Sequence, residues 1–401
     1  MIASSQSSIL LSMGTRPEII KMAPIYIELK RRNANVKLLH TGQHSDMAET
    51  LYKMFDIVPD YHLDLKRDTP QSGSEEGPKA SDLAALSATL LVECSKLLAT
   101  VNPYMVLVHG DTSSAVMMAL ASYYHQCKIA HIEAGLRSYD EYHPFPEEKN
   151  RVMIGQLAHY HFAPTARARD NLLKESIPVA SIHLVGNTIV KAAQLGAQML
   201  DTHRKGAATD IPDLVEMLDK QKNGKRMMLV TTHRRENHET GIRSIAGAVI
   251  DMLTTYPDML IVWPLHPNPK VMAIVEQELK NLDSTLAERL HLTKPLSYPV
   301  LLWVLKHAWI VLTDSGGIQE EAVSLGTPVL VLRKTTERQE LIEAGAGALV
   351  GTQKEKILAA IKALTDNPEQ YDAMCNAPNP FGDSDVVHRI CNILLGVDSH
   401  E

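Results

Sequence analysis

The stretch WIVLTDSGGIQEEAVSLGTPVLVLR (residues 309–333) contains an apolar run, a turn with two glycines, a helical pattern and a second apolar run. Short β-branched apolar runs are typical of buried parallel strands, and the order strand, helix, strand predicts a parallel sheet. A helix that opens at Ser315, Gly316 and Gly317 presents unpaired backbone N–H groups, which a phosphate can approach closely where no Cβ shields them. The alternative is an ordinary tight turn in which Ser315 caps the helix.

The same alternation of apolar runs and helical patterns extends over the whole chain. A polar, charged interval at residues 204–226 separates two sets of strand-like runs: SILLSMG, VKLLHTG, MVLVHG, KIAHIEAG, HYHFAP and IHLVG before it, and MMLVTTH, MLIVWPLH, RLHLTKP, WIVLTDS, PVLVLR and ALVG after it. This pattern predicts two doubly wound α/β sheets, and 401 residues suit two domains. Since the amphipathic segment DVVHRICNILL can return to the first domain, we place that domain at residues 1–186 plus 385–401 and the second at residues 187–384.

Composition narrows the class of protein. The formal net charge of −7 gives no overall attraction to nucleic acid. Four scattered cysteines without a CxxC pair suggest neither a disulfide framework nor a thiolate zinc site, and reduced thiols point to the cytoplasm. The N-terminal segment lacks a basic region, and its apolar part is too short for a signal peptide or a membrane span. The segment QSGSEEGPKAS (residues 71–81) reads as a loop.

Cationic side chains follow several predicted strands, and ligands of doubly wound sheets bind beyond the carboxyl ends of the strands. Arg16 follows the first strand, and Lys21 lies about one turn into the next helix. A guanidinium fork and an ammonium point charge suit a diphosphate, although exposed charges at a helix start are the alternative. In the second half, His233, Arg234 and Arg235 follow a strand, a position that favours a binding cleft over a solvated face.

Carboxylates follow strands in the first half. Asp111 and Glu133 each come directly after a buried-type strand, and Glu147 and Glu148 stand in HPFPEEKNR. Carboxylates from successive strand ends can meet and act as base and acid. As alternatives, Asp111 can cap a helix that begins near Thr112, and Glu147 can stabilise the first turn of a helix.

The histidines and glycines bear on cofactors. We assign His40, His109 and His131, which stand among aliphatic residues, to structural roles and single out His233. No HExxH or comparable spacing predicts a metal site. No GxGxxG follows the first strand, so neither a nicotinamide cofactor nor a nucleoside triphosphate is supported, and we expect no cofactor.

Long motifs in one order resemble the bacterial UDP-N-acetylglucosamine 2-epimerases of the non-hydrolysing type: GTRPE, TGQH, VLVHGDT, IEAGLR, PFPEEKNR, VGNT, TTHRREN, LTDSGGIQEEA and LGTPVLVLRKTTER. The resemblance implies a fold like that of the glycosyltransferase B enzymes, with two Rossmann-like domains around a cleft. It implies interconversion of UDP-GlcNAc and UDP-ManNAc without NAD or metal. It also implies a homodimer. In the implied mechanism, UDP leaves to give 2-acetamidoglucal and is added back after C2 is reprotonated on the other face.

The resemblance implies roles for the residues that match its motifs. Acid and base work falls to Asp111, Glu133 and Glu147, and His233 assists near the leaving diphosphate. The implied phosphate contacts are Arg16, Lys21, Arg234, Arg338, Ser315, Gly316 and Gly317. Glu321 would accept bonds from the ribose, whereas its neighbour Glu320, about 100° around the helix, is structural. Gln43 and His266 match a second, activating UDP-GlcNAc site.

Other activities remain open from the sequence. A hydrolysing relative would release N-acetylmannosamine and UDP with nearly the same residues. An epimerase of a related UDP-diacetamido sugar and a glycosyltransferase share the fold, and a sugar-nucleotide sensor would not need three carboxylates.

Overall fold

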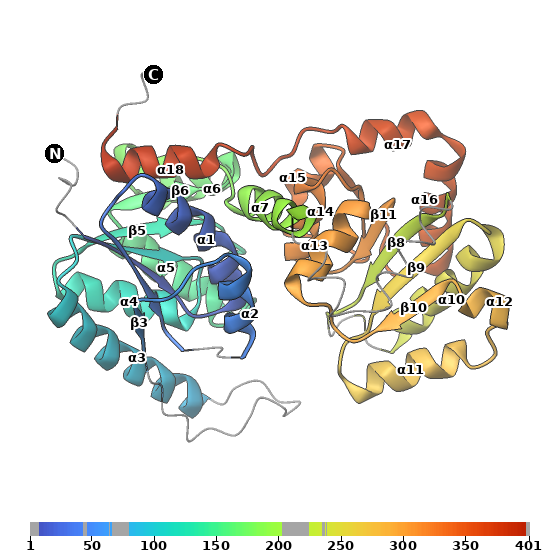
Figure 1. Cartoon of the computed structure of the whole chain (residues 1–401), viewed down its shortest axis with the longest axis horizontal. Helices are drawn as coiled ribbons and strands as arrows, with labels where there is room; N and C mark the ends of the chain where they lie inside the picture. The colour runs from blue at the N-terminus through green and yellow to red at the C-terminus, as the bar shows by residue number, and fades with distance from the viewer. Residues whose placement is uncertain are drawn as a thin grey trace. The chain divides into compact units, whose positions relative to one another are not determined.

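The computed structural model describes residues 8–42, 46–63, 65, 80–202, 224–234, 237 and 239–397. The chain divides into two compact units, Met1–Ala192 with Phe381–Glu401, and Ala193–Pro380 (Figure 1). The sequence predicts these changes of domain after residues 186 and 384. Most of the predicted loop at residues 71–81 and of the charged interval at residues 204–226 lies outside the described residues.

The first unit contains a seven-stranded sheet in the order β3-β2-β1-β4-β5-β6-β7. Its strands are β1 (Ile9–Met13), β2 (Val36–His40), β3 (Tyr61–His62), β4 (Met105–His109), β5 (Lys128–Ile132), β6 (Tyr160–Ala163) and β7 (Ile182–Leu184). Every pairing is parallel. The helices are α1 (Arg16–Arg31), α2 (Asp46–Met54), α3 (Ala80–Val101), α4 (Ser113–Tyr124), α5 (Glu147–Leu157), α6 (Ala166–Lys174), α7 (Ile189–Thr202) and α18 (Val386–Leu395), with a short 3₁₀ turn at Val179–Ser181.

The second unit repeats this plan in a six-stranded parallel sheet of order β10-β9-β8-β11-β12-β13. Its strands are β8 (Arg226–Thr231), β9 (Met259–Pro264), β10 (Leu290–Thr293), β11 (Ile310–Thr313), β12 (Val329–Val331) and β13 (Gly347–Leu349). The helices are α10 (Thr240–Thr255), α11 (Pro269–Leu279), α12 (Ser284–Ala287), α13 (Tyr298–His307), α14 (Gly316–Ser324), α15 (Gln339–Glu343), α16 (Lys354–Asp366) and α17 (Pro368–Cys375). Each sheet has the Rossmann order, and the predicted fold class is confirmed.

The apolar runs became strands because helices cover both faces of each sheet, so that alternate side chains cannot reach water. In the first unit α1 and α18 lie on one face and α3 and α4 on the other (Figure 1). All five residues of β1 and of β4 are buried. Each of the twelve predicted runs contains a strand. The two-residue edge strand β3 was missed because Tyr61 and His62 carry no apolar pattern.

The closing helix α18 belongs to the first unit and packs on α1. The face of α18 that carries Val387, Ile390, Cys391 and Leu394 is buried. Beside it, Arg32, the C-cap of α1, donates to Asn392 Oδ1 at 2.6 Å. An amphipathic segment far along the chain thus completes the helical cover of the first sheet.

The long helix α3 is unusually apolar for its exposure. Asp82–Val101 has a mean hydropathy of 1.5, so it is long and apolar enough to cross a membrane by length and composition alone. Only 17% of it is buried. Among the described residues it is the one such helix, which is weak evidence for a membrane. Leu90, Cys94 and Leu98 are buried at four-residue spacing in the core shared with α4.

Both sheets reverse their strand order at one place. The sequence of neighbours changes direction between β1 and β4 in the first unit and between β8 and β11 in the second. The helices that follow the two strands at such a point leave on opposite faces, which opens a crevice at the carboxyl ends. Functional side chains are therefore expected in the segments that follow these four strands.

Candidate active site

A buried carboxylate joins the segments that follow β1 and β4. Glu18, on the first turn of α1, accepts bonds from Gly14 N at 2.8 Å and Thr15 N at 2.7 Å through Oε2. Its Oε1 accepts a bond from Thr112 Oγ1 at 2.6 Å. Burial raises the pKa of Glu18, and the bonds from Thr112 and Gly14 act in the opposite direction. Glu18 thereby fixes the backbone on either side of the strand reversal.

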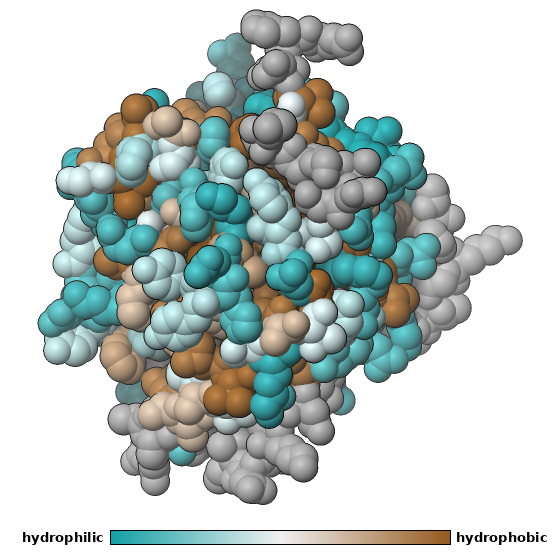
Figure 2. Space-filling model, turned by 90° about the vertical axis from the view of Figure 1, so that its left-hand side faces the viewer, coloured by the Kyte–Doolittle hydropathy of each residue, from teal (hydrophilic) through white to brown (hydrophobic). Residues whose placement is uncertain are grey.

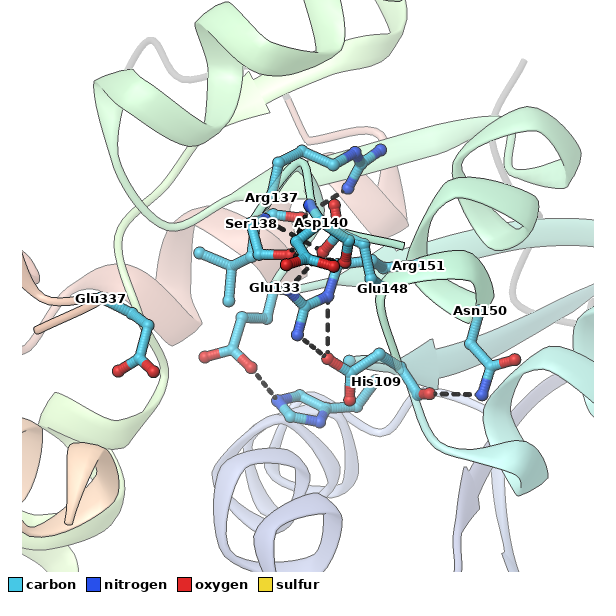
Figure 3. A network of polar contacts seen from close by, with 12 residues as sticks. His109, Glu133, Arg137, Ser138, Asp140, Glu148, Asn150, Arg151 and Glu337 are labelled. Carbon is cyan, nitrogen blue, oxygen red and sulfur yellow. Dashed lines mark hydrogen bonds and ion pairs between the residues drawn. The ribbon is translucent and has the colours of Figure 1, made fainter. Parts of the chain in front are cut away.

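Glu133 directly follows β5 and lies at the centre of a polar cluster. Its backbone φ of 63° is in the left-handed region, which residues other than glycine rarely adopt and which occurs often at functional sites. Oε1 is ion-paired with Lys21 Nζ and accepts a bond from Asn187 Nδ2 at 2.9 Å. Oε2 lies 3.3 Å from His109 Nε2, toward which the carboxylate points (Figure 3).

This cluster bears on two expectations. Lys21, which we expect to contact phosphate, is buried and ion-paired with Glu133. His109, which we assigned to a structural role, points at Glu133 from the end of β4. By contrast, His131 is fully buried, its Nε2 lies 2.7 Å from the Gly110 carbonyl, and burial lowers its pKa to about 3, as suits a structural histidine.

Asp111 follows β4 and is held by Arg151 of α5. Arg151 Nε lies 3.0 Å from Asp111 Oδ2, Nη2 contacts the same oxygen, and Nη1 lies 3.0 Å from Glu148 Oε2. Asn150 Nδ2 also donates to the backbone oxygen of Asp111 at 2.8 Å. The alternative role of Asp111 as a helix cap is wrong, because Thr112 caps α4 and accepts from Ala115 N.

Glu148 organises the segment between β5 and α5. Glu148 is 4% exposed, and its carboxylate accepts a bond from the backbone N–H of Ser138 at 3.0 Å (Figure 3). The backbone N–H of Tyr139 donates to the same carboxylate at 3.1 Å. Glu147, the predicted acid or base, is the first residue of α5 and is half-buried. Glu147 therefore starts a helix whose next residue anchors the preceding loop.

In the second unit, α14 begins at Gly316 with Ser315 as its N-cap, and the Ser315 side chain makes no capping bond. The Arg338 guanidinium lies over this helix start, because a Cβ on Gly316 would be 3.0 Å from Arg338 Cζ. A Cβ on Gly317 would meet no described atom outside its own helix within 4 Å. Arg338 Nε donates to Glu320 Oε1 at 2.9 Å. Glu320 thus holds the guanidinium over the helix start.

More cationic groups lie near α14. Arg234, half-buried, has Nη2 3.9 Å from Glu337 Oε1, and Arg338 Nη1 lies 3.9 Å from Oε2 of the same carboxylate. Arg333 Nη1 lies 2.7 Å from Glu337 Oε2. Burial acts to raise the pKa of Glu337, but a backbone hydrogen bond and Arg333 together lower it below its ordinary value. Three guanidinium groups therefore surround one carboxylate at this edge.

The exposed side chain of His233 follows β8, and its ring lies 5.8 Å from that of His266 in an edge-on arrangement. His266 accepts a bond from Asn268 N at 3.2 Å through Nδ1. Glu321 is buried on α14, and Arg16 is the first residue of α1. Gln43 and Arg235 lie outside the described residues.

Several of these residues carried a signal that sequence reasoning did not use. His109 ends a strand, Arg151 stands in the EEKNR motif four residues after Glu147, and Asn187 follows β7. Glu18 belongs to GTRPE, but its partner Thr112 is 94 residues away, so only the fold could pair them. Among the described residues, no group of three His, Cys, Asp or Glu side chains could hold a metal ion.

Two Rossmann-like units, with carboxylates held by cations in one unit and a guanidinium beside a helix start in the other, define the glycosyltransferase B-like fold class. A family model described as UDP-N-acetylglucosamine 2-epimerase matches residues 27–395. The chain belongs to the UDP-N-acetylglucosamine 2-epimerase family, and the predicted family and enzyme class, an epimerase, are confirmed.

Individual relatives agree. UDP-N-acetylglucosamine 2-epimerase of Escherichia coli (strain K12) is 40% identical over 390 residues, which cover 96% of this chain and 98% of that protein. The Campylobacter jejuni enzyme is 39% identical and covers 98% of each chain. The solved structure of UDP-GlcNAc 2-epimerase from Neisseria meningitidis bound to UDP-GlcNAc is 36% identical, covers 97% of this chain and 100% of its own, and superimposes with a TM-score of 0.82. The Methanocaldococcus jannaschii enzyme in complex with UDP-GlcNAc and UDP is 31% identical, with a TM-score of 0.72 and coverages of 96% and 99%.

Proposed function

We propose that this chain reversibly epimerises C2 of UDP-N-acetylglucosamine to give UDP-N-acetylmannosamine, without hydrolysing the product. The observation that carries the proposal is Glu133, a residue in the left-handed backbone conformation whose carboxylate is held by Lys21 and Asn187. A proton-transfer group needs this kind of fixed orientation. The relatives that share the family are named for this substrate, and two of them were solved with UDP-GlcNAc bound.

The chemistry follows from the acidity of the sugar. The C2 hydrogen of N-acetylglucosamine is not next to a carbonyl, so no carboxylate can remove it while C1 stays bonded to phosphate. When the C1–O bond breaks, UDP takes the electron pair and C1 becomes cationic, which acidifies C2–H. A carboxylate then takes the proton and leaves 2-acetamidoglucal. Protonation of C2 on the other face and re-addition of UDP complete the epimer.

We assign acid and base work to Asp111, Glu133 and Glu147, which stand on separate segments of the first unit. Arg151 keeps Asp111 next to a fixed positive charge, and Lys21 does the same for Glu133. Each cation holds its carboxylate in one orientation, as a proton-transfer group needs.

Leaving-group stabilisation falls to the second unit. The open helix start at Ser315, Gly316 and Gly317, with Arg338 above it, offers N–H donors and a forked cation to a diphosphate. We assign Arg234 and Arg16 to further phosphate contacts, Glu321 to the ribose, and His233 to the departing oxygen.

The experiment is incubation with UDP-GlcNAc in D2O, followed by NMR. We expect both UDP-sugars with deuterium at C2. Free N-acetylmannosamine with an equal amount of UDP would show the hydrolysing reaction, and transfer of the sugar to an acceptor would show a glycosyltransferase. If deuterium never enters C2, both epimerase activities are excluded. The same incubation with a UDP-diacetamido sugar tests the alternative that the chain epimerises this related substrate.

Asp111→Asn should remove C2 exchange while UDP still binds. The amide keeps the shape and loses the basicity, and loss of a general base costs about 10²–10⁴-fold in rate. UDP affinity, measured by calorimetry, should stay close to that of the wild type. Unchanged turnover would contradict the role of Asp111.

We further infer a cytoplasmic homodimer that supplies surface-polysaccharide precursors and binds neither nucleic acid nor membrane. The exposed side chains of Val92 on α3 and of Tyr123 and Tyr124 on α4 support an association surface. Figure 2 shows apolar groups interrupting the polar surface on one face of the molecule. The net charge of −7 disfavours nucleic acid. Activation by a second UDP-GlcNAc at Gln43 and His266 belongs to the same proposal.

A further inference from the structure

Asp314 is a fully buried carboxylate between β11 and the N-cap of α14. Parallel pairing of Thr313 with Thr231 brings the end of β11 beside the end of β8. The donors that meet Asp314 come from the segment after β8: His233 N at 2.9 and 3.1 Å, Arg234 N at 3.0 Å and Asn237 Nδ2 at 2.7 Å.

These contacts have an energetic reason. A buried carboxylate is costly unless hydrogen bonds replace its water, and here two backbone N–H groups and an amide do so. Asn237 also donates to the Leu332 carbonyl at 3.1 Å, which ties the same segment to the end of β12. The backbone at His233 is therefore fixed while its side chain stays exposed.

We propose that Asp314 is a positioning residue: it holds the segment after β8 so that His233 and Arg234 project in the orientation that the reaction needs. This inference rests on the proposed function of His233. Asp314 itself is fully buried and exposes no atom to a ligand. Its described contacts go to this segment rather than to the first turn of α14, so it does not serve as an ordinary helix cap.

Asp314→Asn tests the proposal. In the variant, a donor amide nitrogen replaces one of the two acceptor oxygens of the carboxylate. This nitrogen would face N–H donors of the segment after β8, so the segment must shift. We expect kcat to fall about 100-fold, as a misplacement near 1 Å can cause. His233→Ala should lower kcat as well, and the double variant should be little worse than the more impaired single variant, because both changes remove one function.

The matched control is Asp258→Asn. Asp258 belongs to the same unit and pairs with Arg226 at the amino ends of the strands. We expect this variant to keep the wild-type kcat. Additive effects of Asp314→Asn and His233→Ala, or a wild-type kcat in folded Asp314→Asn, would overturn the proposal.

A spectroscopic reading separates this inference from the epimerase proposal. With ¹⁵N-histidine labelling, and the peak assigned by its loss in His233→Ala, the His233 amide proton should move upfield in Asp314→Asn. If the wild type shows no C2 exchange, the proposed function fails while this shift still decides whether Asp314 fixes the segment. An unmoved amide overturns the role of Asp314. If Asp314→Asn does not fold, Asn237→Ala should give a smaller loss of kcat with a shift in the same direction.

Discussion

At the scale of single residues, opposed charges fix the carboxylates of the first unit. Glu133 meets Lys21 and Asn187 on one oxygen and His109 on the other, and Asp111 meets Arg151. Each pair is largely buried, where removal of one partner leaves a charge without compensation. The cations therefore determine how these carboxylates point.

Lys21→Met decides between the two roles of Lys21. The change keeps the bulk of a side chain that is 7% exposed and removes the charge beside Glu133. We expect C2 exchange to slow by about 100-fold, with UDP affinity near that of the wild type. The converse result, weaker UDP binding with unchanged exchange, would show that Lys21 contacts phosphate, as the sequence predicts.

At the scale of elements, the start of α14 combines open N–H groups with a guanidinium. Gly317→Ala should weaken UDP binding about tenfold in calorimetry, or ~1.4 kcal/mol. Apart from the neighbouring backbone of α14, no atom of the described residues lies within 4 Å of the added Cβ, so we attribute the expected loss to the ligand. Gly316→Ala should also weaken binding because Arg338 must move.

The control for both glycine variants is Gly247→Ala within α10. There the added Cβ meets only the flexible end of Lys354, and alanine favours the helix. UDP affinity should not change in this variant. Unaltered binding in Gly317→Ala would place the diphosphate away from α14.

At the scale of the whole molecule, buried histidines link stability to pH. Burial lowers the pKa of His131 to about 3 and acts in the same direction on His161 and His183. Above the ordinary pKa of about 6.5, these histidines are neutral in both states and cost nothing. As pH falls from there toward 3, the unfolded chain gains protons first, so stability declines.

His131→Gln measures this linkage. Between pH 7.5 and pH 5, the free energy of unfolding of the wild type should fall by about 2 kcal/mol more than that of the variant, as urea titrations followed by circular dichroism would show. Equal losses in the two proteins would contradict a neutral buried His131. The expected difference assumes that His131 in the unfolded chain is exposed to water and has the ordinary pKa of about 6.5.

The homodimer is also tested at this scale. Light scattering should give twice the monomer mass, and Val92→Glu on α3 should shift it toward the monomer, because a charge is costly in an apolar contact. Val58→Glu, on the loop between α2 and β3, is the control, as Val58 is 78% exposed. A wild-type monomer that binds lipid vesicles through α3 would contradict the dimer.

The sequence alone determined the twelve main strands and the polar residues that follow them, because burial on both faces leaves an apolar run and ligand binding places polar groups at the carboxyl ends. It also carried the family motifs. Only the tertiary structure decided the partners: Lys21 reaches Glu133 across 112 residues, and Asp314 reaches His233 across 81. Such pairs depend on strand order and register, which bring distant segments to one edge of a sheet and leave no periodic trace in the chain.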